Sequence, residues 1–443
     1  MIKERINQLR ELNKSNDIDG YIVPKNDAYF SEYAFPNRLK TISNFSGSAG
    51  FAIILKNRNY LFVDGRYTLQ AKMECGKYFK ILEIPKIFPF NILKKFKKKL
   101  SIGFDPKIFT SITLRRYFNN SCNLVAINNN LIDEIHFERK IKNSSNFYAL
   151  NHKITGKKVI SKINKLREVL KKKKIDNILV SAPENVAWLL NIRGKDNPNS
   201  PIPNCKAVVS RDKNIFLFAD FSKIKKIKKI QIFKKIRFKK FNEFFSTINQ
   251  LKGKNFCVDK LTCSVYNQSL INSKFNIISY NDPCYNFKSI KSTNEIKYMK
   301  DAHIYDGVAL TKFLFWLKHN KKNNLSELTV EKKLEKFRKR NKNYLYPSFN
   351  TIAGSGPNGA IIHYRANKKT NRKISSNDLF LCDSGGQYKY GTTDVTRTIC
   401  FKNQSRRIKD IFTRVLKGHI AVANTNLNKI NKGYLIDKKA RYW

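Results

Sequence analysis

Several kinds of sequence signal are scarce or absent in this chain of 443 residues. No window approaches the roughly 18 uninterrupted apolar residues that a membrane-spanning helix needs. The charged start, Met1-Ile2-Lys3-Glu4-Arg5, does not have the apolar segment that is typical of a signal peptide. We therefore expect a cytoplasmic protein without a membrane-spanning segment.

Cysteine pairs and several common catalytic motifs are also missing. The eight cysteines are scattered and form no C-x-x-C pair, which favours reduced thiols over a disulfide framework or a structural zinc site. The chain contains no Walker loop, no H-E-x-x-H pair and no nucleophile elbow. The sequence therefore does not support the enzyme classes that these motifs define.

Acidic residues are few relative to basic ones. The chain has 33 Asp and Glu against 87 Lys and Arg, which gives a formal net charge of +54. Such an excess is compatible with nucleic-acid binding. The basic residues are spread through every region, however, and are not gathered in one arm or stripe. We therefore favour a lysine-biased composition over a nucleic-acid partner.

The order of expected elements is repeated along the first two thirds of the chain. Apolar residues make up 41% of the sequence, which excludes a disordered or collagen-like chain. The first stretch predicts a helix with Ile6, Leu9 and Leu12 on one face, strands at 20–23, 50–55 and 60–63, and a helix near 68–73. The second stretch predicts a helix at 159–170, a strand at 177–180 and hairpin strands at 207–209 and 215–218. A break at 143–146 separates them. We predict two α/β domains of one architecture, residues 1–152 and 153–284.

The basic stretch from Lys223 to Lys240 allows two interpretations. Ile224, Ile227 and Ile230 recur every three residues among lysines, which is typical of a basic amphipathic helix, and a strand-like run follows. A membrane-surface or RNA-binding helix is one interpretation. The absence of tryptophan anchors favours the other, a solvated face of the second domain.

A third region, residues 285–443, changes in character along its length. It begins with a long helix from Thr293, with Ile296, Met299, Ala302, Ala309, Leu310, Phe313 and Leu314 on one broad apolar face, and a second helix over 326–340. From Phe349 to Phe401 the chain turns to glycine, serine, threonine and strand formers. The residue types suited to chemistry are concentrated in this later part.

Two aspartates lie in the two strand-like runs of this part, Asp383 at the end of 379–383 and Asp394 within 392–399. A hairpin centred between Tyr388 and Lys389 would place Asp383 directly opposite Asp394, with the two Cβ atoms about 5 Å apart. Carboxylates at that distance repel each other unless a proton or cation lies between them, and a pair of divalent ions would fit the gap. The alternative is that both are turn residues beside a glycine-rich hairpin.

A glycine cluster precedes the only histidine that we consider as a site residue. Gly354, Gly356 and Gly359 indicate a tight loop, and His363 is expected on the strand that follows it. In that position His363 could orient a substrate or transfer a proton. The alternative is a hydrogen-bonded core histidine.

Together these segments resemble the aminopeptidase P (Xaa-Pro aminopeptidase) branch of the pita-bread metallopeptidases. The similar segments are Tyr21–Pro24, Ser31–Tyr33, Phe45–Gly50, Asp64–Tyr67, Ala187–Gly194, Ser348–Ile352, Gly356–Tyr364, Asp383–Tyr388 and Gly391–Thr398. The resemblance implies two creatinase-type N-terminal α/β domains followed by a pita-bread (α+β) catalytic domain. It covers essentially the whole chain.

The resemblance also implies an activity and a set of site residues. It implies a metal-dependent aminopeptidase that releases the N-terminal residue from peptides with proline in second position, by attack of a hydroxide that bridges two divalent ions, with manganese expected. Asp383 and Asp394 are implied as metal ligands, and His363 as a substrate-binding residue. Arg66 is implied to reach toward peptide bound in the partner subunit of a homodimer.

One departure from the family pattern concerns the ligand set. The family uses two Asp, one His and two Glu ligands and a further catalytic His, and the late His and Glu residues are not found before Trp443. We therefore expect a C-terminally truncated, incomplete catalytic domain whose catalytic residues are unknown and which is inactive as given. The alternatives are a non-catalytic relic or binding protein of this fold, a prolidase acting on dipeptides, and a nucleic-acid-associated protein.

Overall fold

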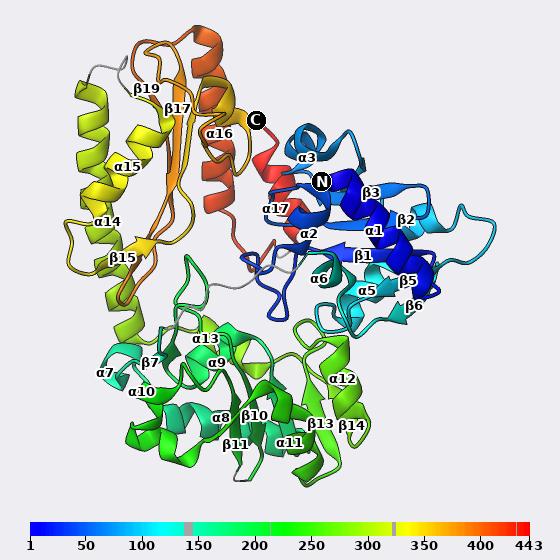
Figure 1. Ribbon diagram of the computed structural model, residues 1–443. Helices are drawn as coiled ribbons and strands as arrows, with labels where there is room; N and C mark the ends of the chain where they lie inside the picture. The colour runs from blue at the N-terminus through cyan, green and yellow to red at the C-terminus, as the bar shows by residue number, and fades with distance from the viewer. Residues whose placement is uncertain (137–144, 213, 321–324, 431) are drawn as a thin grey trace.

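The computed structural model describes residues 1–136, 145–212, 214–320, 325–430 and 432–443. Three bodies follow one another along the chain: a first domain (α1–α6), a middle domain (β7–α13) and a third region (α14–α17) (Figure 1). The predicted break at 143–146 falls partly outside the described residues.

The first domain is a six-stranded mixed sheet with helices on both faces. The strands are ordered β4-β3-β2-β1-β5-β6; the central β1–β2 and β2–β3 pairs are antiparallel and the other pairs are parallel. Its elements are α1 (Ile2–Ser15), β1 (Gly20–Pro24), α2 (Arg38–Ser43), β2 (Phe51–Leu55), β3 (Asn59–Asp64), α3 (Thr68–Cys75), β4 (Lys80–Ile84), α4 (Pro89–Leu93), β5 (Ser101–Phe104), α5 (Ser111–Phe118), β6 (Asn123–Ala126) and α6 (Leu131–Ile135).

The middle domain repeats this topology strand for strand. Its sheet is ordered β12-β11-β10-β8-β13-β14, with the same two central antiparallel pairs. Its elements are β7 (Tyr148–Ala149), α7 (His152–Thr155), α8 (Val159–Lys172), β8 (Asn177–Val180), α9 (Pro183–Leu189), β9 (Ile192–Arg193), β10 (Lys206–Ser210), β11 (Ile215–Phe218), α10 (Lys225–Lys228), η1 (Gln231–Lys235), β12 (Arg237–Lys239), η2 (Phe241–Glu243), α11 (Phe244–Gln250), β13 (Asn255–Val258), α12 (Val265–Asn272), β14 (Asn276–Ser279) and α13 (Pro283–Ser289). The predicted repeat of architecture is confirmed.

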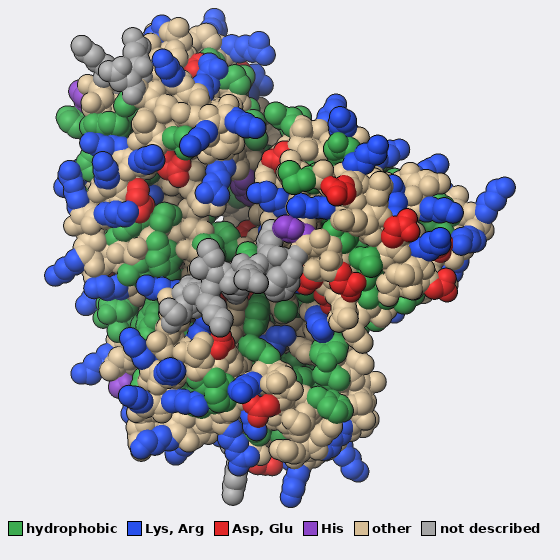
Figure 2. Space-filling view, in the orientation of Figure 1, with side chains coloured by type: hydrophobic (Ala, Val, Ile, Leu, Met, Phe, Trp, Pro, Cys, Tyr) green, Lys and Arg blue, Asp and Glu red, His purple; other side chains and the backbone are tan. Residues whose placement is uncertain are grey.

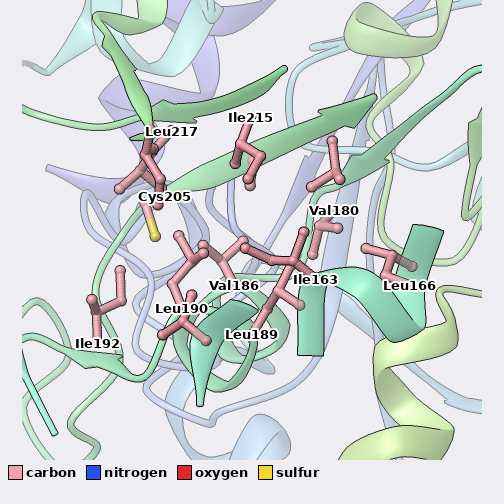
Figure 3. Packing of buried hydrophobic residues seen from close by; sticks show 14 of the residues in the cluster. Ile163, Leu166, Val180, Val186, Leu189, Leu190, Ile192, Cys205, Ile215 and Leu217 are labelled. Carbon is pink, nitrogen blue, oxygen red and sulfur yellow. The ribbon is translucent and has the colours of Figure 1, made fainter. Parts of the chain in front are cut away.

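Apolar periodicity explains how the middle domain forms its buried core. Val159, Ile163, Leu166 and Leu170 of α8 are buried at helical spacing. They pack on alternating residues of the central strands, such as Val180 and Leu217, to form one core (Figure 3). A second buried cluster lies on the opposite face of the same sheet. Both faces of this sheet are therefore covered.

The helix and strand expected in the basic stretch are present but short. Helix α10 is a single turn, a 3₁₀ helix follows it, and only residues 237–239 form a strand, β12. Ile224, Ile227 and Phe233 are buried in the core of the middle domain, so the chain folds back on its own sheet, and most of the lysines, apart from the buried Lys223, lie at the surface. The interpretation as an ordinary surface of this domain is supported.

The third region combines two helices with a small sheet. Its elements are α14 (Thr293–His319), α15 (Glu327–Arg338), β15 (Tyr344–Pro347), β16 (Ile352–Ser355), η4 (Gly356–Ala360), β17 (Leu379–Ser384), β18 (Gly386–Tyr388), β19 (Val395–Cys400), α16 (Arg406–Ala423) and α17 (Gly433–Ala440). Strands β16, β17 and β19 form an antiparallel sheet, while β18 pairs with β15.

The apolar face predicted for the long helix is only partly buried. Leu310, Phe313 and Leu317 lie in the core of this region. Ile296 and Met299, in the first turns of α14, are 44% and 38% exposed. They line a cavity together with Tyr148 and Arg193 of the middle domain.

Basic side chains are spread over the visible face of all three bodies, with acidic side chains scattered between them (Figure 2). No stripe of one charge stands out on this face. Among the described residues, no helix is long and apolar enough to cross a membrane.

Candidate active site

The hairpin that contains the two aspartates pairs in a register different from the predicted one. Asp383 on β17 lies opposite Thr396 on β19, and Gln387 bridges to Thr392. The centre of the hairpin is therefore between Lys389 and Tyr390, one residue later than predicted, so Asp383 and Asp394 are diagonal rather than directly opposite. Because side chains alternate along a strand, Asp394, two residues before Thr396, is on the same face as Asp383.

The environment of Asp383 is unusual for a carboxylate. Burial is the largest influence and raises its pKa; the negative charge of Asp394 raises it further, while a hydrogen bond from Thr396 and the imidazole of His363 lower it. The Oδ1 atom of Asp383 is buried, and no hydrogen-bond partner for it lies among the described residues. A buried carboxylate oxygen without a partner is costly unless a proton or cation occupies the adjacent position.

A buried ion pair supports the strand that bears Asp383. Arg338 of α15 and Asp306 of α14 form two hydrogen bonds, of 2.7 and 3.1 Å, and both side chains are 1% exposed. Arg338 also donates to the hydroxyl of Ser384, next to Asp383, and Tyr388 donates to Asp306. This network fixes the end of β17 against both helices.

The glycine cluster forms the expected tight loop. Gly356 has a positive φ of +56°, which favours glycine, and η4 follows directly after β16. The buried carboxylate of Glu327 accepts hydrogen bonds from the Ser355 amide, the Asn358 side chain and the Tyr364 hydroxyl. These bonds fix both ends of the segment that carries His363.

The prediction that His363 lies on a strand is wrong. It lies in a turn between η4 and Tyr364, with a φ of +57°, and its side chain is exposed. The turn projects the imidazole toward the first domain. Its Nδ1 atom lies 2.7 Å from the Tyr67 hydroxyl, which in turn lies 2.6 Å from the Ser48 hydroxyl.

Arg66 lies beside this contact, at the corner between β3 and α3 as predicted. It forms a bidentate pair with Asp64 at 2.8 and 2.9 Å, and its side chain is 46% exposed. Its guanidinium lies 5.2 Å from the centre of the Tyr67 ring. The hydrogen bond from Arg66 is the main cause that lowers the pKa of Asp64. The first domain therefore approaches His363 of its own chain.

Asp383 and Asp394 supply only some of the donor atoms that a metal site requires. The unpaired oxygen of Asp383 and the adjacent Asp394 fit part of the shell of a divalent ion. Within the part of the chain that the structure describes, no three His, Cys, Asp or Glu side chains form a group that could hold a metal ion. Two ions that each prefer about six donors need more ligands than two carboxylates supply. The described side chains therefore fit part of a di-nuclear site and do not complete one.

Comparison with protein families agrees with this architecture. The Creatinase/Prolidase N-terminal domain matches residues 5–135 and, in a second form, residues 138–295. Metallopeptidase family M24 matches residues 297–442. These matches follow the order of the two repeated α/β domains and the third region. The boundaries predicted at 152/153 and 284/285 stay predictions.

Individual relatives extend the match over the whole chain. A probable Xaa-Pro aminopeptidase P of Laccaria bicolor is 34% identical over 460 residues, covering 99% of this chain and 71% of the relative. Xaa-Pro aminopeptidase ApepP of Drosophila melanogaster is 34% identical, covering 98% and 75%. X-prolyl aminopeptidase of Caenorhabditis elegans, a cytosolic enzyme with a di-nuclear active site, superposes with a TM-score of 0.88 at 29% identity, covering 96% of this chain and 74% of its own.

The chain therefore belongs to metallopeptidase family M24 and carries the creatinase-type N-terminal domains of that family. Within the family, it groups with the Xaa-Pro aminopeptidase P relatives. The predicted family and fold are confirmed. The predicted truncation is not confirmed; the matches cover nearly all of this chain and 71% to 75% of the length of these relatives. The roles of Arg66, His363, Asp383 and Asp394 stay predictions.

Two features of the site were missed by sequence reasoning. Tyr67 was noticed only as part of the segment Asp64–Tyr67, and no pattern linked it to His363, 296 residues away. Asp306 and Arg338 lie on the buried sides of their helices, and charged residues on an apolar helix face were the available signal. A charged residue on such a face is expected to be buried and paired, but the sequence does not identify the residue with which it pairs.

Proposed function

We propose that this protein is a metal-dependent aminopeptidase that releases the N-terminal residue from peptides with proline in second position. The observation that carries the proposal is the buried, unpaired Oδ1 of Asp383 beside Asp394. The names of the relatives support the substrate class. Manganese as the metal, the homodimer and the cytoplasmic location belong to the same proposal, and the location is supported by the cytosolic C. elegans relative.

The described side chains suggest how a peptide would be held. If Tyr67 donates its proton to Nδ1 of His363, the neutral imidazole carries its own proton on Nε2. An Nε2–H group that faces solvent can donate to a peptide carbonyl. Asp383 and Asp394 would hold the metal ions, and bound ions would supply a nucleophile and polarise the scissile carbonyl.

A second candidate function is a non-catalytic binding protein of the same fold. It is favoured by the absence, among the described residues, of a group of three or more metal-ligating side chains. Such a protein would bind proline-containing peptides through His363 and the surrounding turn without cleaving them.

One assay separates the two functions. The protein is incubated with the peptide Arg-Pro-Pro and manganese, and released arginine is quantified by chromatography. The enzyme proposal expects release that is lost on chelation and in Asp394→Asn, and that is kept in Asp410→Asn, a carboxylate exposed on α16. No release under any metal, together with calorimetric binding of the peptide, supports the binding protein. Release that survives both chelation and Asp394→Asn contradicts the metal site.

The contact between Tyr67 of the first domain and His363 of the third region gives a finer test. We expect Tyr67→Phe to weaken binding of Arg-Pro-Pro, because His363 loses the hydroxyl that fixes its tautomer and orientation. Tyr78→Phe is the matched control, since Tyr78 is an exposed tyrosine of the same domain. Equal binding by both variants would show that Tyr67 has no positioning role.

A further inference from the structure

A cavity of about 740 Å³ lies between the middle domain and the third region. It is bordered by β7, α7 and β9 of the middle domain, by the first turns of α14, and by the tip of the hairpin at 387–392. Its volume is within the range of sites for small molecules. The candidate metal ligands do not line it.

The walls of this cavity are predominantly apolar. The apolar and aromatic side chains that line it are Tyr148, Leu150, Ile154, Pro201, Ile296, Met299, Ile304, Leu345, Tyr388 and Tyr390. Ile296, Met299 and Ile304 of α14 are among its exposed apolar residues, at 44%, 38% and 62% exposure. Grouped apolar side chains that remain exposed at an inter-domain cavity are typical of a ligand site.

Arg193 is one of the charged side chains that line the cavity. Its Nη1 atom donates to the carbonyls of Ile192 and Ala187, at 2.9 and 3.3 Å. No carboxylate of the described residues lies within ion-pair distance of it, and burial lowers its pKa. A guanidinium in such a place has donors available for a planar anion.

Most of the other charges around the cavity are positive as well, and the charge of Glu295 acts on Arg193. Lys291, Lys300 and Lys389 line it, and among the described lining residues only Glu295 is acidic. One oxygen of Glu295 already accepts the amide of Ser292 in the capping box of α14. The cavity therefore combines apolar walls with a net positive charge.

We propose that this cavity binds an organic carboxylate with an apolar body, whose carboxylate pairs with Arg193. The apolar body would lie against the first turns of α14. The proposal does not depend on the aminopeptidase activity, since the site is formed by different residues and its test requires no cleavage.

A pair of matched probes tests the proposal. 4-Phenylbutyrate and 4-phenylbutanol have the same apolar body, and only the first carries a carboxylate. Binding of each to the full chain is measured by calorimetry at fixed ionic strength. We expect the carboxylate to bind at least about tenfold more tightly, as for a charge-assisted bidentate contact.

Variants assign the effect to the cavity. We expect Arg193→Gln to remove the preference for the carboxylate, and Ile296→Asp to weaken both probes. Arg167→Gln is the control, because Arg167 also donates to a backbone carbonyl in the middle domain and does not line the cavity. Circular dichroism checks that each variant is folded.

Three outcomes would overturn the proposal. They are equal affinity of the wild type for both probes, no binding of either probe, and a preference that Arg193→Gln leaves intact. Loss of aminopeptidase activity in any variant would not bear on it.

Discussion

The middle domain and the third region use similar elements and differ in how completely those elements are covered. In the middle domain, β8, β10 and β11 are buried almost throughout, and helices cover both faces of the sheet. Edge strands are partly exposed in both regions, as in β14 and β19, so the difference between the regions lies in their helices. The comparison shows that a regular apolar pattern forms a helix or strand without ensuring that its apolar face is covered.

Helix α16 makes the difference most visible. Its apolar side chains Ile411, Phe412, Val415, Leu416 and Ile420 form one stripe at helical spacing, and each is at least 46% exposed. The equivalent stripe of α8 is buried. The apolar core of the third region lies around Leu310, Phe313 and Leu317, away from this stripe, and the buried pair of Asp306 and Arg338 adds polar contacts to it.

The largest expected effect on stability concerns the buried pair of Asp306 and Arg338. Asp306→Ala leaves the charge of Arg338 buried without its partner, so we expect a loss of about 3–5 kcal/mol in the free energy of unfolding of the third region. The control is Asp410→Ala, which removes an exposed pair with Arg414 and should cost less than about 0.5 kcal/mol. Both are measured by urea unfolding. Similar small losses would mean that the pair does not stabilise this region.

The next effect compares one substitution in the two regions. Leu166→Ala in α8 opens a cavity in a fully buried core, so we expect a cost of about 2–5 kcal/mol. Leu416→Ala in α16 removes a side chain that is 46% exposed, and we expect a change within about 0.5 kcal/mol. The measurement is the chemical unfolding midpoint of each variant. A large cost at Leu416 would show that the face of α16 is covered in solution.

The free energy of unfolding of the middle domain is expected to depend on pH through Lys162. Lys162 is 2% exposed and donates to the Trp188 carbonyl and the Asn191 side chain, and burial lowers its pKa to about 7. The unfolded chain, with a lysine pKa of about 10.4, therefore binds the proton more strongly between pH 7 and 10. The contribution of this group to the free energy of unfolding rises with pH across that window and is lost as the pH falls toward 7.

The variant that tests this effect is Lys162→Met, which has no titratable group. We expect the free energy of unfolding of the wild type to gain about 2 kcal/mol relative to the variant between pH 7 and pH 9. Urea unfolding of both proteins at pH 7, 8 and 9 measures the difference. Parallel pH profiles would show that Lys162 titrates normally in the folded state.

The smallest effect on stability is expected at the junction between the first domain and the third region. Arg66→Ala removes an exposed pair with Asp64, so we expect the free energy of unfolding to change by at most about 0.5 kcal/mol. Under the proposed function, cleavage or binding should weaken most for tripeptides and longer peptides. Unchanged kinetics and binding on these peptides would leave Arg66 as a surface ion pair.

The local pattern of the sequence determined most of the helices and strands. The strands predicted at 177–180 and 215–218 are found at those residues, and the helix predicted from Thr293 begins there. The repeat of architecture also followed from the order of apolar runs. These features depend on periodicity and turn residues, which are local properties of the chain.

The tertiary structure decided where the chemical groups lie. The one-residue error in the centre of the hairpin moved Asp394 from directly opposite Asp383 to a diagonal position, because the chain turns at Lys389 and Tyr390, where the Tyr388 amide donates to the Gly391 carbonyl. The strand predicted for His363 became a turn held by Glu327. Glu327 is 37 residues away from Tyr364, so no local pattern could specify the contact that holds this turn.

Sequence by itself determined the family, the two repeated domains and the two aspartates on one face of a hairpin. Only the tertiary structure brought Tyr67 within 2.7 Å of His363, buried Asp306 against Arg338, and left Arg193 facing an apolar cavity. The physical reason is that secondary structure follows from nearest-neighbour preferences along the chain. Contacts between side chains far apart in the sequence depend on how whole domains pack.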